Sequence, residues 1–125
     1  MKVFNQLIEL CEKNNLNYRV GKEDNSEFYL LESKNKKIYF YDFMILELKI
    51  IFEFQGKIWH SKTYKENNTN PFGYDLTNQF NIDKIKKELS EKNGFEVVYL
   101  WEEDGFEYNI KKSISLIRDR LGLSI

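Results

Sequence analysis

Apolar residues recur at the three- and four-residue spacing of an amphipathic helix in three stretches of the chain. These stretches span residues 2–14, about 79–92 and about 107–121. Asn93-Gly94 follows the second stretch and supplies the kind of C-terminal cap that ends a helix. The pattern therefore predicts three helices, with inward-facing stripes of Val3, Leu7 and Leu10 in the first, Ile82, Ile85 and Leu89 in the second, and Ile110, Ile114, Ile117 and Leu121 in the third.

Between the helices lie segments rich in aromatic and aliphatic residues, which are typical of strands. Residues 17–21 and 27–31 form two short segments, and 38–45, 48–54 and 95–101 form longer apolar runs. Runs without polar alternation indicate strands buried on both faces, so 38–45 and 48–54 are expected to be central. The passage from 48 to 101 is long enough for a crossover between parallel strands. The fold class predicted is α/β, with a mixed central sheet flanked by helices in one domain covering residues 1–125.

Composition narrows the possible chemistry. The 125 residues include 19 Lys and Arg, 20 Asp and Glu, one Cys and one His, for a net charge of −1. A single Cys excludes a disulfide within the chain, and a single His excludes a metal site built from several imidazoles. A bound metal would therefore be held mainly by carboxylates, as Mg²⁺ is. Without an apolar run of membrane-spanning length or a signal peptide, we expect a soluble, intracellular (cytoplasmic) protein.

Two apolar runs each contain one acid, Asp42 in the first and Glu53 in the second. A carboxylate in a buried strand is costly unless it is paired, hydrogen-bonded or bound to metal. Two acids on neighbouring strands repel each other unless a cation lies between them. The alternative is that each acid sits at a strand end and meets a Lys or a helix N-terminus. Two such acids, followed by the only His, favour the metal site.

The polar stretch 57–78 begins after Gly56 and contains His60, a candidate for proton transfer near neutral pH. The alternative for His60 is a surface imidazole bonded to the backbone. Asp83 opens the second helix, where it either stabilises the helix dipole or orients His60 or a metal-bound water. Lys84, Lys86 and Lys87 follow, either as a solvated face or as phosphate contacts.

The order of these residues resembles the very short patch repair endonucleases and the phage homing endonucleases of the EDxHD type, within the PD-(D/E)xK nuclease superfamily. The resemblance covers roughly residues 38–103. It rests on Asp42, on Phe52-Glu53-Phe54-Gln55-Gly56 with Trp59-His60, on Asp83 with its basic helix, and on Asn93-Gly94-Phe95, Val97-Val98-Tyr99-Leu100 and Trp101-Glu102.

The resemblance implies a restriction-endonuclease-like core and Mg²⁺-dependent hydrolysis of double-stranded DNA, with Mn²⁺ as a substitute. Asp42 would be the main metal ligand, His60 the general base or acid, and Asp83 its supporting acid. Glu53 and Gln55 fill the positions of the superfamily's Glu-x-Lys, and Gln55 cannot supply the positive charge of that Lys. The carbonyl of Phe54 would be a further metal ligand, and Glu27 is the candidate for the family's early Glu. The zinc site of the patch-repair enzymes is absent, which favours the phage-type branch.

Two other interpretations stay open. A nuclease-like fold without activity could bind DNA or a partner protein, which the Gln at position 55 and the near-zero net charge favour. A plain α/β domain could hold its acids in salt bridges. A chain of this length has little room for a separate specificity domain, so specificity could come from a partner protein or an additional domain.

Overall fold

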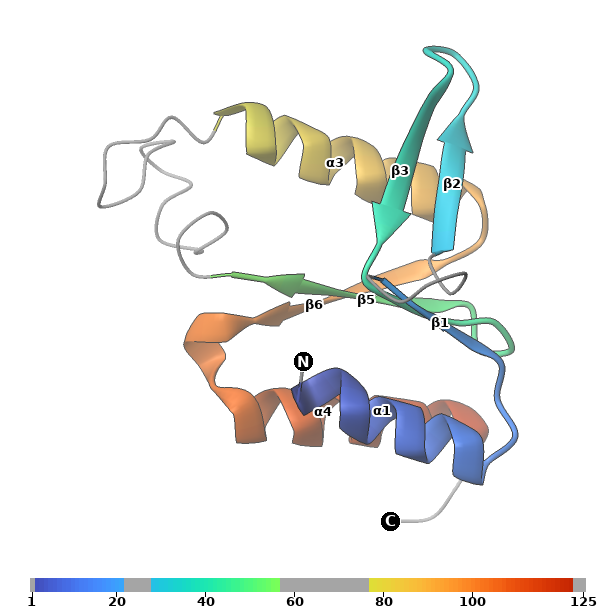
Figure 1. Ribbon diagram of the computed structural model, residues 1–125, viewed down its shortest axis with the longest axis vertical. Coiled ribbons are helices and arrows are strands. Elements are labelled where there is room, and N and C mark those ends of the chain that lie inside the picture. The colour runs from blue at the N-terminus through green and yellow to red at the C-terminus, as the bar shows by residue number, and fades with distance from the viewer. Residues whose placement is uncertain (1, 22–27, 57–76, 123–125) are drawn as a thin grey trace.

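The computed structural model describes residues 2–21, 28–56 and 77–122 (Figure 1). Glu27, His60 and residues 57–76 of the expected polar stretch lie outside these ranges. The elements, in chain order, are α1 (Lys2–Lys13), β1 (Tyr18–Val20), β2 (Phe28–Glu32), β3 (Lys37–Tyr41), β4 (Phe43–Ile45), β5 (Ile50–Gln55), α3 (Thr77–Lys92), β6 (Glu96–Trp101), the short 3₁₀ helix η2 (Glu102–Asp104) and α4 (Phe106–Leu121).

The central sheet has four strands in the order β1-β4-β5-β6. Strands β1, β4 and β5 pair antiparallel, whereas β5 and β6 pair parallel, as the length of the passage between them predicts. Helices α1 and α4 lie on one side of the sheet and α3 lies on the other (Figure 1). The predicted mixed α/β class, with a mixed sheet flanked by helices, is confirmed. A second sheet, the antiparallel hairpin β2–β3, stands beside α3.

Strand β5 joins two hydrophobic cores. Its Ile50 and Phe52 belong to the larger core, under α1 and α4, whereas Ile51 belongs to the smaller core on the other side. All three side chains are fully buried. Phe52 packs edge-on against Phe43 at a ring-centroid distance of 6.3 Å. The burial of β5 on both faces, predicted from its unbroken apolar run, is therefore confirmed.

The apolar run 38–45 is not one buried strand, contrary to the prediction. It breaks at Asp42 into β3, which pairs only with β2, and β4, which joins the central sheet. Ile38 and Phe40 of β3 remain 52% and 54% exposed. The physical reason is that carboxylates replace backbone carbonyls at this point. The N–H of Asp42 donates to the Glu53 carboxylate, and the Asp42 carboxylate accepts the N–H of Phe54. The chain therefore leaves the ladder there, and Gly21 donates its N–H to the carbonyl of Asp42 at 2.7 Å.

The predicted inward stripe of α3 is partly wrong. Leu89 is buried, but Ile85 is 37% exposed and lines a groove with Leu31 of the hairpin. The buried hydroxyl residue Ser90, one residue after Leu89, occupies the inward side instead. Helix α3 and the hairpin lie on the same face of the central sheet, and α3 covers only part of that face (Figure 1). The side of α3 that faces the sheet therefore carries polar groups as well as apolar ones.

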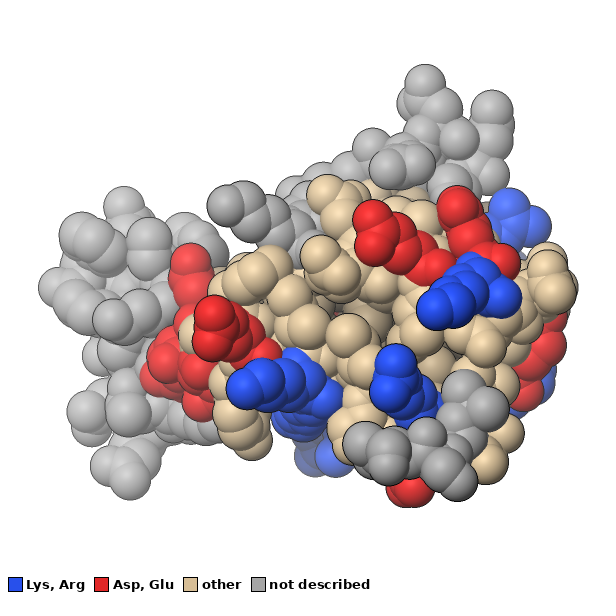
Figure 2. Space-filling view, turned by 90° about the horizontal axis from the view of Figure 1, so that it is seen from below, with Lys and Arg blue, Asp and Glu red and all other residues tan. Residues whose placement is uncertain are grey.

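The outer surface of α1 and α4 is charged without being dominated by one sign. Seen from below, acidic and basic side chains are interspersed across this face (Figure 2). An ion pair joins α4 to the central sheet, with Arg120 of α4 lying 2.6 Å from Glu96 of β6. In the parts of the chain that the structure describes, no helix has the length and apolar character needed to cross a membrane.

The different environments of β5 and β3 predict different costs of truncation. Ile51→Ala removes a fully buried side chain and should lower the free energy of unfolding by about 2–5 kcal/mol. Ile38→Ala acts on an exposed strand position and should cost less than about 1 kcal/mol. Equilibrium urea unfolding followed by circular dichroism measures both. Equal losses would contradict the division of 38–45 into an exposed and a buried strand.

Candidate functional site

Two hydrogen bonds join Asp42 to β5, one with Glu53 and one with Phe54. The backbone N–H of Asp42 donates to Oε2 of Glu53 at 2.9 Å, and the N–H of Phe54 donates to Oδ2 of Asp42 at 2.8 Å. The register of β4 on β5 pairs Phe43 with Phe52, so Asp42 and Glu53 are the next residues where the ladder ends. Each carboxylate thereby satisfies a backbone donor that a continuing strand would have used.

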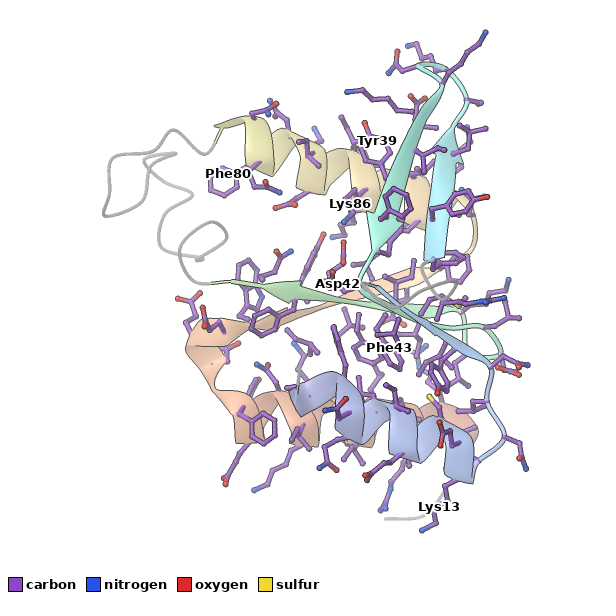
Figure 3. The ribbon with its side chains drawn as sticks, in the orientation of Figure 1. Lys13, Tyr39, Asp42, Phe43, Phe80 and Lys86 are labelled. Atoms are coloured by element: carbon purple, nitrogen blue, oxygen red, sulfur yellow. The ribbon has the colours of Figure 1, made fainter. Side chains whose placement is uncertain are left out.

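A third charged group comes from α3. The ammonium of Lys86 forms an ion pair with Oε1 of Glu53, the carboxylate oxygen that Asp42 leaves free. Lys86 points from α3 toward the sheet at Asp42 (Figure 3). Its nitrogen lies 4.8 Å from the ring centre of Tyr41, and the Tyr41 hydroxyl donates to the carbonyl of Lys86 at 2.8 Å. Tyr41 is itself buried, so it fixes both the backbone and the charged end of Lys86.

The electrostatics of this cluster are those of an acidic site with too little positive charge. Burial and the negative charge of Asp42 raise the pKa of Glu53 to about 7, although Lys86 and the Asp42 N–H act in the opposite direction. Burial, followed by the charge of Glu53, also raises the pKa of Tyr41. Two carboxylates therefore face one ammonium, and an additional cation would be attracted to them.

Glu53 and Gln55 occupy the same face of β5, since side chains two residues apart on a strand point the same way. Gln55, which is buried, helps to line a pocket of about 220 Å³ between β5, β6 and α3. The other lining residues are Phe80, Asp83, Lys84, Lys87, Tyr99 and Trp101. Burial, followed by the charges of Asp83, Glu53 and Glu91, raises the pKa of Tyr99 to about 12.

The backbone of Phe54 also faces the acidic cluster. In an extended strand the N–H and the carbonyl of one residue point to the same side. Because the N–H of Phe54 bonds to Asp42, the carbonyl of Phe54 lies on that side as well, away from β6. The role of this carbonyl in metal binding stays a prediction.

The structure brings together only part of the predicted site. Asp42, Glu53 and Phe54 adjoin one another, and Asp83 lines the adjacent pocket, where it accepts a hydrogen bond from Gln79 at 3.0 Å. His60 and Glu27 are outside the described residues. Among the residues that are described, no three His, Cys, Asp or Glu side chains converge closely enough to hold a metal by themselves.

Lys86 is the residue that sequence reasoning did not assign to the site. Its neighbours Lys84 and Lys87 led to its interpretation as part of a solvated or phosphate-facing charge run. A signal for its placement was nevertheless present in the helical spacing. Lys86 lies four residues after Ile82 and three before Leu89, so it falls on the stripe that was expected to face inward.

No model of a known protein family matches the sequence, and no curated protein is significantly similar to it.

The environment of Glu53 predicts a specific dependence of stability on pH. Because the folded-state pKa of Glu53 is raised to about 7, the folded state binds more protons than the unfolded state between about pH 4.5 and pH 7. The free energy of unfolding should therefore fall as the pH rises through this window. The contribution of Glu53 to this fall is about 3 kcal/mol. Urea unfolding in EDTA at several pH values should show that Glu53→Gln removes it.

Glu47→Gln is the control, because the pKa of Glu47 is shifted in the opposite direction to that of Glu53. Desolvation raises the pKa of Glu47, but hydrogen bonds from the backbone N–H groups of Glu47 and Asn17 and from the Asn17 side chain outweigh it, so the pKa is lowered. Glu47 therefore stabilises the protein above its unfolded-state pKa, and this stabilisation is lost as the pH falls. If Glu53→Gln left the slope between pH 4.5 and 7 unchanged, the assigned environment of Glu53 would be wrong.

Proposed function

We propose that this chain is a metal-dependent DNA endonuclease that hydrolyses phosphodiester bonds in double-stranded DNA, either by nicking or by cutting both strands. We also propose that its fold is a restriction-endonuclease-like core of the homing-endonuclease type, acting inside the cell. The observation that carries the proposal is the cluster of Asp42, Glu53 and Lys86 beside β5, immediately before β4 begins. Two acids and one amine beside a pocket are suited to phosphoryl chemistry.

The residues present fit a hard divalent cation. Asp42, Glu53 and the carbonyl of Phe54 offer oxygen ligands on one side of β5, and Mg²⁺ needs only one or two carboxylates when phosphate oxygens and water complete its shell. The excess of carboxylates over ammonium favours such an ion. Bound Mg²⁺ or Mn²⁺ would polarise the phosphate and stabilise charge on the leaving oxygen.

Lys86 supplies the positive charge that Gln55 cannot. In the pattern that the chain resembles, this charge comes from the strand, two residues after the Glu. Here the amine comes from α3 and reaches the same carboxylate, Glu53. We assign to Lys86 the neutralisation of negative charge on the phosphate during attack. His60 would transfer the proton with Asp83 as its supporting acid, and Glu27 would assist; these three roles rest on the resemblance.

The competing function is a nuclease-like module without activity that binds DNA or a protein partner. The specific observation in its favour is that the acids already have partners. Glu53 is paired with Lys86, and Asp42 accepts the Phe54 N–H, so the cluster also serves as a structural network between α3 and the sheet. Activity and metal binding distinguish the two functions.

A plasmid-nicking assay with Mg²⁺ or Mn²⁺ tests the endonuclease. Asp42→Ala and His60→Ala should abolish nicking, and Lys86→Met should lower its rate by about 10²–10³-fold, because stabilisation of transition-state charge is lost. Lys13→Met is the matched control, since Lys13 lies on the opposite side of the molecule (Figure 3). Nicking that survives both Asp42→Ala and His60→Ala would reject the assignment.

Calorimetry with Mn²⁺ separates a metal site from a structural salt bridge. The wild type should bind Mn²⁺, and Asp42→Asn should weaken binding by more than about tenfold. Lys86→Met should strengthen it, because the ammonium competes with the metal for Glu53. A structural network predicts a different result: Lys86→Met would lower the free energy of unfolding by about 3–5 kcal/mol, and no form of the protein would bind Mn²⁺.

A further inference from the structure

One face of the β2–β3 hairpin is apolar and exposed. Tyr29 pairs with Phe40 across the two strands, and Leu31 pairs with Ile38. All four side chains are between 52% and 56% exposed. Tyr29 and Phe40 stack edge to face, with ring centres 6.0 Å apart. The opposite face already packs on the smaller core through Phe28, Leu30, Tyr39 and Tyr41, so this apolar face does not serve to attach the hairpin.

The tip of the hairpin is basic. Lys34 and Lys36 lie in the turn that joins the strands, Lys37 is the first residue of β3, and all three are exposed. Glu32 is the acid at this tip, and its carboxylate accepts the backbone N–H groups of Lys34 at 3.0 Å and Asn35 at 2.9 Å. Glu32 therefore orders the turn, and three lysines against this one acid leave the tip with a net positive charge.

The hairpin is joined directly to the candidate site. Strand β3 begins at Lys37 and ends at Tyr41, immediately before Asp42. At about 3.3 Å per residue, the basic tip lies roughly 17 Å from Asp42 along the strand. In Figure 1 the hairpin rises from the sheet on the α3 side, the side from which Lys86 reaches Glu53.

We propose that the β2–β3 hairpin is an arm that binds double-stranded DNA. In this arrangement Lys34, Lys36 and Lys37 contact phosphates. The apolar face that carries Tyr29 and Phe40 lies in the major groove. A two-stranded ribbon fits the major groove, and apolar side chains beside basic ones are common where proteins insert into DNA. The proposal rests on the proposed function and adds to it the element that holds the substrate.

Charge selects DNA over a second copy of the chain as the partner. The exposed apolar face is bordered at the tip by three lysines, which attract phosphates and gain affinity by releasing their counterions. A second copy would present the same lysines again, and its net charge of −1 offers little attraction. Self-association through this face would contradict the proposal.

The test measures the salt dependence of binding to a labelled duplex of about 20 base pairs, by fluorescence anisotropy in EDTA. Lys34→Gln combined with Lys37→Gln should weaken binding about tenfold or more and reduce the log–log salt slope by about 2, because each lysine contact with a phosphate contributes about 1. Lys13→Gln combined with Lys111→Gln changes the net charge equally on the α1/α4 face and should leave the slope unchanged. Phe40→Thr should weaken binding without changing the slope.

The outcomes distinguish this inference from the proposed function, because no metal is present and binding is measured without cleavage. A wild type that binds the duplex with the predicted slope change but never nicks DNA would support the arm and reject the endonuclease. A wild type that nicks DNA, with equal slopes for the hairpin and control variants, would overturn the arm. A dimer that Phe40→Thr converts to monomer, with unchanged DNA binding, would also overturn it; sedimentation measures this outcome.

Discussion

The exchange of hydrogen bonds between Asp42 and β5 is the constraint on which the arrangement of this protein depends. At Asp42 the ladder between β4 and β5 stops being backbone to backbone and continues through two carboxylates. A buried N–H without a hydrogen-bond partner would be costly, so the carboxylates of Asp42 and Glu53 accept these bonds where β3 turns away from the central sheet. The break places two acids next to each other at the end of a buried strand.

The same break sends the chain in a new direction. Residues before Asp42 belong to a hairpin that stands off the sheet, and residues after it lie in the core. Tyr41, the last residue of β3, then bonds to the backbone of α3 at Lys86. A single short segment therefore connects the hairpin, the central sheet and the helix that carries the amine.

The cluster has both a structural and a chemical aspect, and the same forces produce both. Glu53 is buried beside another acid, which raises its pKa and makes proton, ammonium and metal ion competitors for one carboxylate. In the protein alone, the ammonium of Lys86 is the cation that pairs with this carboxylate. A divalent cation held by Asp42 and Glu53 would neutralise more of their negative charge and release Lys86 toward a phosphate. For this reason the cluster supports the proposed hydrolysis.

The sequence by itself determined the three helices, the burial of β5 on both faces and the parallel crossover to β6, because periodicity and unbroken apolar runs report directly on burial. It also singled out Asp42 and Glu53, since isolated acids in apolar runs need partners. Only the tertiary structure decided which partners they have. The apolar pattern of 38–45 is the same whether the run is one strand or two, and hydrogen bonds to a strand eleven residues later broke it at Asp42. Lys86 likewise required the docking of α3, because the spacing that turns it inward does not say which carboxylate it meets.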